Sequence, residues 1–279
     1  MSKYTNIFLL LTFITLSESF APLKMCMHSF ETPDTCTFKD VILNKTDIEF
    51  TSIFLPEVTK IHFTKSSIPK LGSSICARIF YDIQNSPNII EIHLTRTKIE
   101  EVTSNAFSHC PNLQVINLRN NLIEVLPTDA FNRNKNLENL DLSSNLIERL
   151  ENEIFFGLKK LRELKLSGNK FKSISSQIFE GLTGLEVLRL DSNDLFDLNL
   201  KKILTFTLNL KKMAYNNNQM RCNHIKNMNK MLRERKINLD TEYEGELRTR
   251  SQPSELQDEI ICLNDLNWVI LHYIFIYSQ

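Results

Sequence analysis

The sequence has no excess of charge of either sign, because its 33 Lys and Arg residues match its 33 Asp and Glu residues. This balance argues against nucleic acid as a partner, since binding to phosphates needs a strong basic excess. Glycine is scarce, with 6 residues in 279, whereas Leu (39) and Asn (28) are abundant. Hydrophobic residues still make up 42% of the chain, which is enough for a core and excludes wholesale disorder. Many Leu and Asn residues with few Gly indicate an internal repeat.

Short catalytic motifs are also missing. The sequence contains no G-x-G-x-x-G, P-loop, H-E-x-x-H or G-x-S-x-G pattern, so it lacks the usual signatures of nucleotide binding, zinc hydrolysis and nucleophilic catalysis. We therefore predict a protein that is not an enzyme and that carries no cofactor.

No apolar run is long enough for a helix to cross a bilayer. The runs at 7–16 and 268–277 have ten residues each, against the roughly 20 that a spanning helix needs. The first run follows Lys3 and precedes Ser17-Glu18-Ser19, a pattern typical of a cleaved secretory signal peptide. Residues 1–19 are therefore predicted to be a signal peptide and the protein to be secreted. The apolar tail 263–279 is expected to pack or self-associate; a glycolipid anchor is the alternative, and membrane association is not expected.

The centre of the chain repeats a pattern of the form Leu-x-x-Leu-x-Leu-x-x-Asn-x-Leu. Leu113, Ile116, Leu118, Asn121 and Ile123 set the pattern, which recurs mostly every 24 residues. The alternating part of each unit predicts a short strand whose apolar residues face inward, and stacked units pair these strands in parallel. Eight units are predicted over 38–220, starting near 38, 58, 89, 113, 137, 161, 185 and 210. Their strands should centre near Ile42, His62, His93, Asn117, Asp141, Lys165, Arg189 and Ala214.

The side-chain amide of the repeated Asn can hydrogen-bond backbone groups that the turn after the strand would otherwise bury unpaired. Thr46, Ser66 and Thr97 take its place in the first three units. A hydroxyl makes fewer hydrogen bonds than an amide, so we expect these turns to be less regular.

On these residues the chain resembles extracellular leucine-rich-repeat proteins of the 24-residue type, and in particular the secreted insect leucine-rich-repeat immune proteins. The resemblance implies an α/β solenoid, a horseshoe with a parallel concave sheet and an irregular, short-helical convex side. It also implies disulfide-closed end caps, which we place at 20–37 and 221–262. An amphipathic helix is expected after Cys222, because apolar residues recur there at helical spacing.

The six cysteines are expected to form disulfides, because their number is even and the extracellular space, into which the protein is predicted to be secreted, is oxidising. Cys26 and Cys36 bracket the N-terminal cap, and Cys222 and Cys262 bracket the C-terminal one. The remaining pair, Cys76 and Cys110, would lie in neighbouring coils roughly 5 Å apart, which a disulfide can bridge.

The outward-facing positions of the concave sheet are mixed and mostly polar, which suits a protein partner bound through complementary charge. The candidate ligand-binding residues project from four consecutive regular units: Asn117, Arg119, Asp141, Lys165, Arg189 and Asp191. The alternative is an ordinary solvated sheet in which Asp141 only pairs with Lys165 across strands.

Two histidines, His62 and His93, occupy equivalent outward positions on adjacent units, and Glu91 lies near them in the sequence. Together they offer donors for a metal, but the sequence shows no complete tetrahedral set. We interpret both as surface histidines and predict no metal site.

One N-glycosylation sequon is present, at Asn44, and we expect a glycan there if the protein is secreted. The function predicted from all these features is that of a secreted, non-enzymatic recognition module that binds a protein or microbial-surface ligand through its concave face, with a role in innate immunity. The alternative is a membrane-tethered receptor or adhesion ectodomain. The sequence leaves the oligomeric state open.

Overall fold

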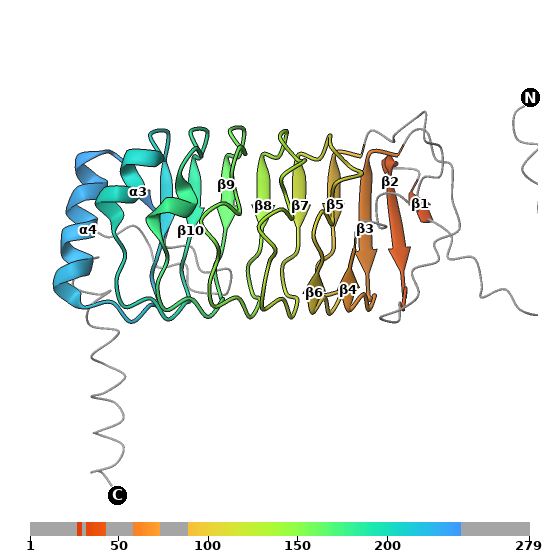
Figure 1. The fold of residues 1–279 in the computed structure, drawn as a ribbon, viewed down its shortest axis with the longest axis horizontal. Helices are drawn as coiled ribbons and strands as arrows, with labels where there is room; N and C mark the ends of the chain where they lie inside the picture. Colours follow the sequence, from red (N-terminus) through yellow and green to blue (C-terminus); the bar gives the residue numbers. More distant parts are fainter. Residues whose placement is uncertain (1–26, 30–31, 43–57, 73–88, 241–279) are drawn as a thin grey trace, which may run out of the picture.

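The fold is a solenoid in which successive coils stack along the long axis in the order of the sequence (Figure 1). The computed structural model describes residues 27–29, 32–42, 58–72 and 89–240. The predicted signal peptide, the apolar tail, Asn44 and Thr46 lie outside these residues. Among the described residues, no helix combines the length and apolar character needed to cross a membrane.

One sheet runs along the whole solenoid. Its strands follow the order β1-β2-β3-β5-β7-β8-β9-β10-β11-β12, and all neighbours pair in parallel except β1 and β2. The strands of this sheet are β1 (Met27–Ser29), β2 (Thr32–Lys39), β3 (Lys60–Thr64), β5 (Glu91–His93), β7 (Val115–Asn117), β8 (Asn139–Asp141), β9 (Glu163–Lys165), β10 (Val187–Arg189), β11 (Lys212–Ala214) and β12 (Asn238–Leu239).

The opposite side of each coil is mostly irregular. It holds a two-stranded pairing of β4 (Lys70–Leu71) with β6 (Glu101–Val102), the 3-10 helix η2 (Ser176–Phe179) and the short helix α3 (Leu200–Phe206). The helix α4 (Cys222–Glu234) covers the C-terminal end of the solenoid (Figure 1). Thus the predicted solenoid, with its parallel sheet and short-helical convex side, is confirmed.

The core is a continuous apolar column that follows from the repeat. In each regular strand the middle residue is buried and its two neighbours are partly exposed. Leu140 and Leu142 both point inward, as the pattern predicted. Phe107, Phe131 and Phe155 stack on the convex side with ring centroids 5.9 and 6.5 Å apart.

The repeated Asn joins each coil to the one before it. Asn145 accepts the backbone N–H of Ile123 at 3.2 Å and donates to the carbonyl oxygens of Leu118 and Leu142 at 3.0 and 2.9 Å. Asn121, Asn169, Asn193 and Asn218 make the equivalent bonds in their coils. The buried backbone groups of the turns are therefore paired by side chains.

Where a hydroxyl replaces Asn, the bonds are fewer. Ser66 Oγ accepts the N–H of Val41 at 3.1 Å and donates to the carbonyl of Thr64 at 3.0 Å. Thr97 Oγ1 donates to the carbonyl of Leu94 at 2.8 Å. Thr97 Oγ1 also lies 3.1 Å from Asn121 Oδ1. Both hydroxyls therefore serve at the Asn position with fewer bonds than the amide makes, and the lower regularity of these turns stays a prediction.

Seven of the eight predicted strand centres lie within strands of the sheet, and the first is wrong. In β2 Thr37, not Ile42, pairs with His62. Ile42 lies beyond the end of β2, forms an isolated bridge to Ser67 and is 68% exposed. Phe38 explains the difference, because its ring stacks on that of Phe63 with 5.0 Å between centroids. This packing places the strand of the first coil five residues earlier in the sequence than predicted, at Thr37 instead of Ile42.

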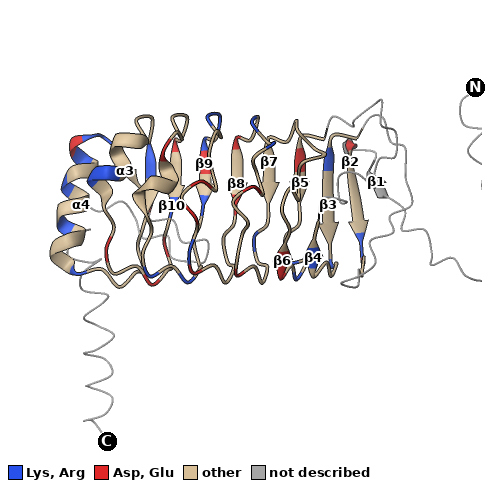
Figure 2. Cartoon of the chain, in the orientation of Figure 1, with Lys and Arg blue, Asp and Glu red and all other residues tan. Residues whose placement is uncertain are grey.

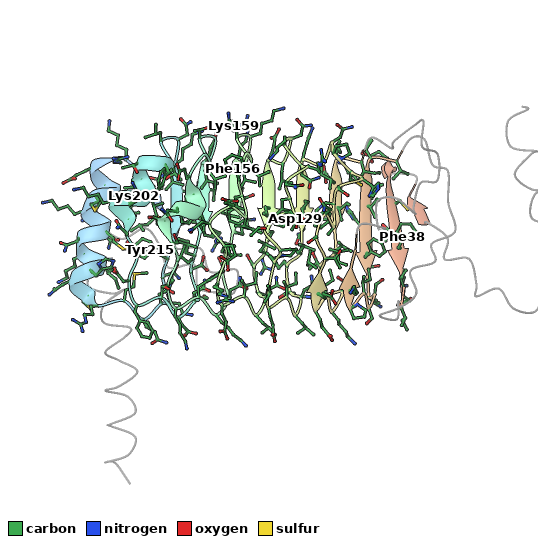
Figure 3. The ribbon with its side chains drawn as sticks, in the orientation of Figure 1. Phe38, Asp129, Phe156, Lys159, Lys202 and Tyr215 are labelled. Carbon is green, nitrogen blue, oxygen red and sulfur yellow. The ribbon has the colours of Figure 1, made fainter. Side chains whose placement is uncertain are left out.

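The C-terminal cap contains the predicted amphipathic helix. In α4, Ile225, Met228 and Leu232 are buried, and Asn229 accepts a hydrogen bond from the hydroxyl of Tyr215 in the last predicted coil. Tyr215 is labelled in Figure 3. After the helix, β12 adds one further parallel strand beside β11, which the sequence interpretation did not anticipate.

Candidate functional site

Four of the six candidate residues end strands that lie side by side on the concave sheet, whereas Arg119 and Asp191 lie two residues beyond the ends of β7 and β10. The central outward positions are in register across β7, β8, β9 and β10: Asn117 is opposite Asp141, Asp141 opposite Lys165, and Lys165 opposite Arg189. Figure 2 shows the two signs of charge on one strand, since β9 begins with the red Glu163 and ends with the blue Lys165.

Four of the six residues line a shallow depression of about 210 Å³. It lies where the strands end, and its lining residues are Arg119, Ser143, Ser144, Lys165, Ser167, Gly168, Arg189, Asp191 and Ser192. Asn117 and Asp141 are not part of the lining. Their side-chain oxygens instead accept the backbone N–H groups of Arg119 at 3.0 Å and Ser143 at 2.9 Å.

Small residues at the turn after each strand keep this depression open. The residue before each repeated Asn has a positive φ, which is 56° at Ser144, 65° at Gly168 and 57° at Ser192. A Cβ atom on Gly168 would lie 3.3 Å from Ser144 Oγ, so a larger side chain would crowd the depression. These turn residues were missed by the sequence interpretation, although their fixed place before the Asn marks them.

Ionic contacts hold Arg189 in place at one side of the depression. Its Nε lies 3.2 Å from Asp191 Oδ1 and its NH1 atom lies 3.5 Å from Asp240 Oδ2. Ser167 Oγ donates to the same Asp191 oxygen at 2.7 Å. The contact of Asp240 with Arg189 was not predicted, because Asp240 directly follows β12, which was not expected. The alternation of apolar and polar residues at 237–239 is the sequence signal for this strand.

Lys165 is the more accessible cation. Its Nζ lies 3.3 Å from Glu163 Oε1 on the same strand, and the side chain is 30% exposed. The ion pair shown for Lys165 is therefore with Glu163 rather than with Asp141, which was the partner in the solvated-sheet alternative. With Arg119 and Arg189, Lys165 gives the depression three cationic side chains. The carboxylates of Glu163, Asp191 and Asp240 contact two of them, so the place suits a partner with complementary charges of both signs.

A second polar cluster lies on the same face nearer the N-terminus. His62 on β3 pairs in register with His93 on β5, and their ring centroids are 4.4 Å apart. His93 Nε2 lies 3.4 Å from Glu91 Oε2. Burial, and next the neighbouring His93, lowers the pKa of His62, so its ring is neutral at neutral pH.

Two of the predicted disulfide cysteines are in disulfide bonds. Cys36 and Cys110 are both disulfide-bonded, and both are buried. Their expected partners, Cys26 and Cys76, lie outside the described residues, as does Cys262, the expected partner of Cys222. The three pairings therefore stay predictions.

Comparison with known proteins supports the repeat directly. The leucine-rich-repeat family model matches residues 87–147 and 135–195. No curated protein sequence matches the chain significantly.

Solved structures of similar fold include the complex of insect LRIM1 with APL1C, at 26% sequence identity and a TM-score of 0.60. This match covers 70% of the present chain and 35% of the LRIM1/APL1C chain. The APL1 leucine-rich-repeat domain matches at 25% identity and a TM-score of 0.57, over 66% of this chain and 47% of that one. The Drosophila complex of Toll with Spatzle has the same fold, at 24% identity and a TM-score of 0.53, over 59% of this chain and 21% of that one.

The chain spans about a third to a half of the first two of these chains. The repeat pattern, the continuous parallel sheet and these matches agree. The chain therefore contains leucine-rich repeats and has the leucine-rich-repeat solenoid fold, and it is similar to the insect leucine-rich-repeat immune proteins LRIM1 and APL1C.

Proposed function

We propose that the protein is a secreted, non-enzymatic recognition module that binds a protein partner through the concave face, in innate immunity. The leucine-rich-repeat fold is typical of protein-recognition modules, and two similar structures are of complexes with protein partners. The observation that carries the proposal is the depression lined by Arg119, Lys165 and Arg189. It is a place on the regular coils where charged groups of a partner find cations and carboxylates close together.

The architecture of the sheet supports binding at this place. Lys165 and Arg189 project from hydrogen-bonded strands of adjacent coils, and Arg189 is fixed by two carboxylates. A preorganised surface loses little conformational entropy on binding. Small hydroxyl side chains between the cations, such as Ser143 and Ser167, can hydrogen-bond a carboxylate or hydroxyl group of the ligand.

Charge reversal in the depression should weaken capture of the partner. Arg189 is a poor choice, because its side chain is 17% exposed and forms two ion pairs, so its reversal would also destabilise the fold. Lys165→Glu combined with Arg119→Glu changes the more accessible charges. We expect the double variant to lose at least about tenfold in affinity, mainly through slower association, since complementary charge steers encounter.

The mature protein serves as bait in extracellular fluid of the source organism, and mass spectrometry identifies the captured partner. The affinity and association rate of the purified partner are then measured on the immobilised wild-type and variant proteins. The matched control is Lys159→Glu with Lys201→Glu, which alters net charge equally at two exposed positions away from the depression. Lys159 lies at the upper edge of the solenoid in Figure 3, and Lys201 lies in α3. Equal capture by both double variants, or loss only in the control, would contradict a binding site in the depression.

A further inference from the structure

The cluster of His62, His93 and Glu91 has the donors and spacing of a metal site. One ligand atom from each residue lies within 4.8 Å of the others. The two histidines come from adjacent strands that are fixed in register by the sheet, and Glu91 lies two residues before His93 on the same outward face of β5. The solenoid therefore brings together the three side chains, as the repeat register indicated for the two histidines.

The distances suit zinc. Zinc bonds to nitrogen and oxygen are about 2.0–2.1 Å, so two ligand atoms of a tetrahedral site lie about 3.4 Å apart. The observed separation of His93 Nε2 from Glu91 Oε2 is 3.4 Å. His62 needs only a small ring movement toward this pair, because all three ligand atoms already lie within 4.8 Å of one another.

His62 provides an independent observation that points to a ligand. Its Nε2 atom is buried and has no hydrogen-bond partner among the described residues. Buried polar atoms in folded proteins are almost always paired, and an unpaired one calls for an explanation such as an ion. A metal bound between the rings of His62 and His93 supplies that partner.

The surrounding charges orient Glu91 for this role. Lys60 Nζ lies 3.5 Å from Glu91 Oε1 and 3.6 Å from Asp34 Oδ2. Lys60 thus contacts one oxygen of Glu91 and leaves the other directed at His93, which is how outer groups commonly orient a metal ligand. The single positive charge of Lys60 is shared by the carboxylates of Glu91 and Asp34, so Lys60, Glu91 and Asp34 together keep a net negative charge.

We propose that His62, His93 and Glu91 bind one Zn²⁺ ion on the concave face. This assignment replaces the interpretation of the two residues as ordinary surface histidines. The set of two histidines and one carboxylate leaves a fourth position for water, and it faces solvent because the side chains of His93 and Glu91 are 30% and 25% exposed. The site is separate from the depression near Lys165 and does not depend on the proposed function.

The test is titration of the mature, full-length protein with Zn²⁺ in competition with a chromophoric chelator, and with Co²⁺ monitored by visible absorption. We expect one ion per chain in the wild-type protein and a tetrahedral Co²⁺ spectrum. His62→Gln and His93→Gln should each weaken binding by about 100-fold or more, given that even outer-shell changes cost about 10–100-fold. Glu91→Gln should weaken it as well.

The control is His109→Gln, which removes an exposed histidine outside the cluster and should leave Zn²⁺ affinity unchanged. Circular dichroism without metal checks that each variant is folded, and Zn²⁺ should raise the melting temperature of the wild-type and control proteins but not of the cluster variants. Wild-type protein that takes up no Zn²⁺ at micromolar concentrations would overturn the proposal. Affinity that survives either histidine change would overturn it too.

Discussion

Phe155→Ala is expected to destabilise the protein by about 3–5 kcal/mol, the range for removing a buried aromatic ring from a core. Phe155 has no exposed surface, and its ring stacks on Phe131 of the preceding coil. In a solenoid each coil contacts only its neighbours, so the cavity weakens the contacts between coils that hold the stack together. Denaturant unfolding followed by circular dichroism measures the loss.

The neighbouring residue is a matched control. Phe156 has the same side chain but is 75% exposed, and Lys135 Nζ lies 6.0 Å from its ring centroid. Phe156→Ala should therefore change the free energy of unfolding by less than about 1 kcal/mol. Similar losses from the two substitutions would show that the convex phenylalanine column does not hold the coils together as described.

Asn145→Ala is expected to cost about 3 kcal/mol. It leaves the N–H of Ile123 and the carbonyls of Leu118 and Leu142 without their side-chain partner, and each buried polar group without a partner costs roughly 1–3 kcal/mol. Asn145→Ser should recover part of the loss, since Ser66 serves at the equivalent place in an earlier coil. Thermal and denaturant unfolding of the three proteins checks the order.

The control for this series is Asn132→Ala, at an exposed position on the convex side. We expect a change within about 0.5 kcal/mol there. A loss from Asn145→Ala no larger than that of the control would mean that water replaces the amide, and that the repeated Asn does not stabilise the stack.

The regular coils could be predicted from the sequence because their period determines which residues face inward. Ile116 occupies the same inward position as Leu140 and Leu164, since any large aliphatic side chain can fill that buried position. The first coil could not be placed in this way. Val41 and Leu43 fit the alternating pattern, but Cys36 and Phe38 fit it also, and only packing against Ile61 and Phe63 decides between them.

The candidate site was predictable in part for the same reason. Once the inward residues are known, the outward columns that carry Lys165 and Arg189 follow. The depression itself depends on the small residues at the left-handed turns, such as Gly168, and on Asp240 reaching Arg189 from the C-terminal cap. The contact between His62 and His93 was predictable from the same columns, because both occupy the central outward position of adjacent units, and the pairing of β3 with β5 confirms it.

The central claim is that the concave face contacts the partner, and site-specific photo-crosslinking tests it most directly. A photoreactive side chain at Asn139, on the outward face of β8, should form a covalent adduct with the captured partner. The same group at exposed Lys201 in α3 should form none. An adduct from Lys201 and none from Asn139 would place the partner on the convex side and contradict the account.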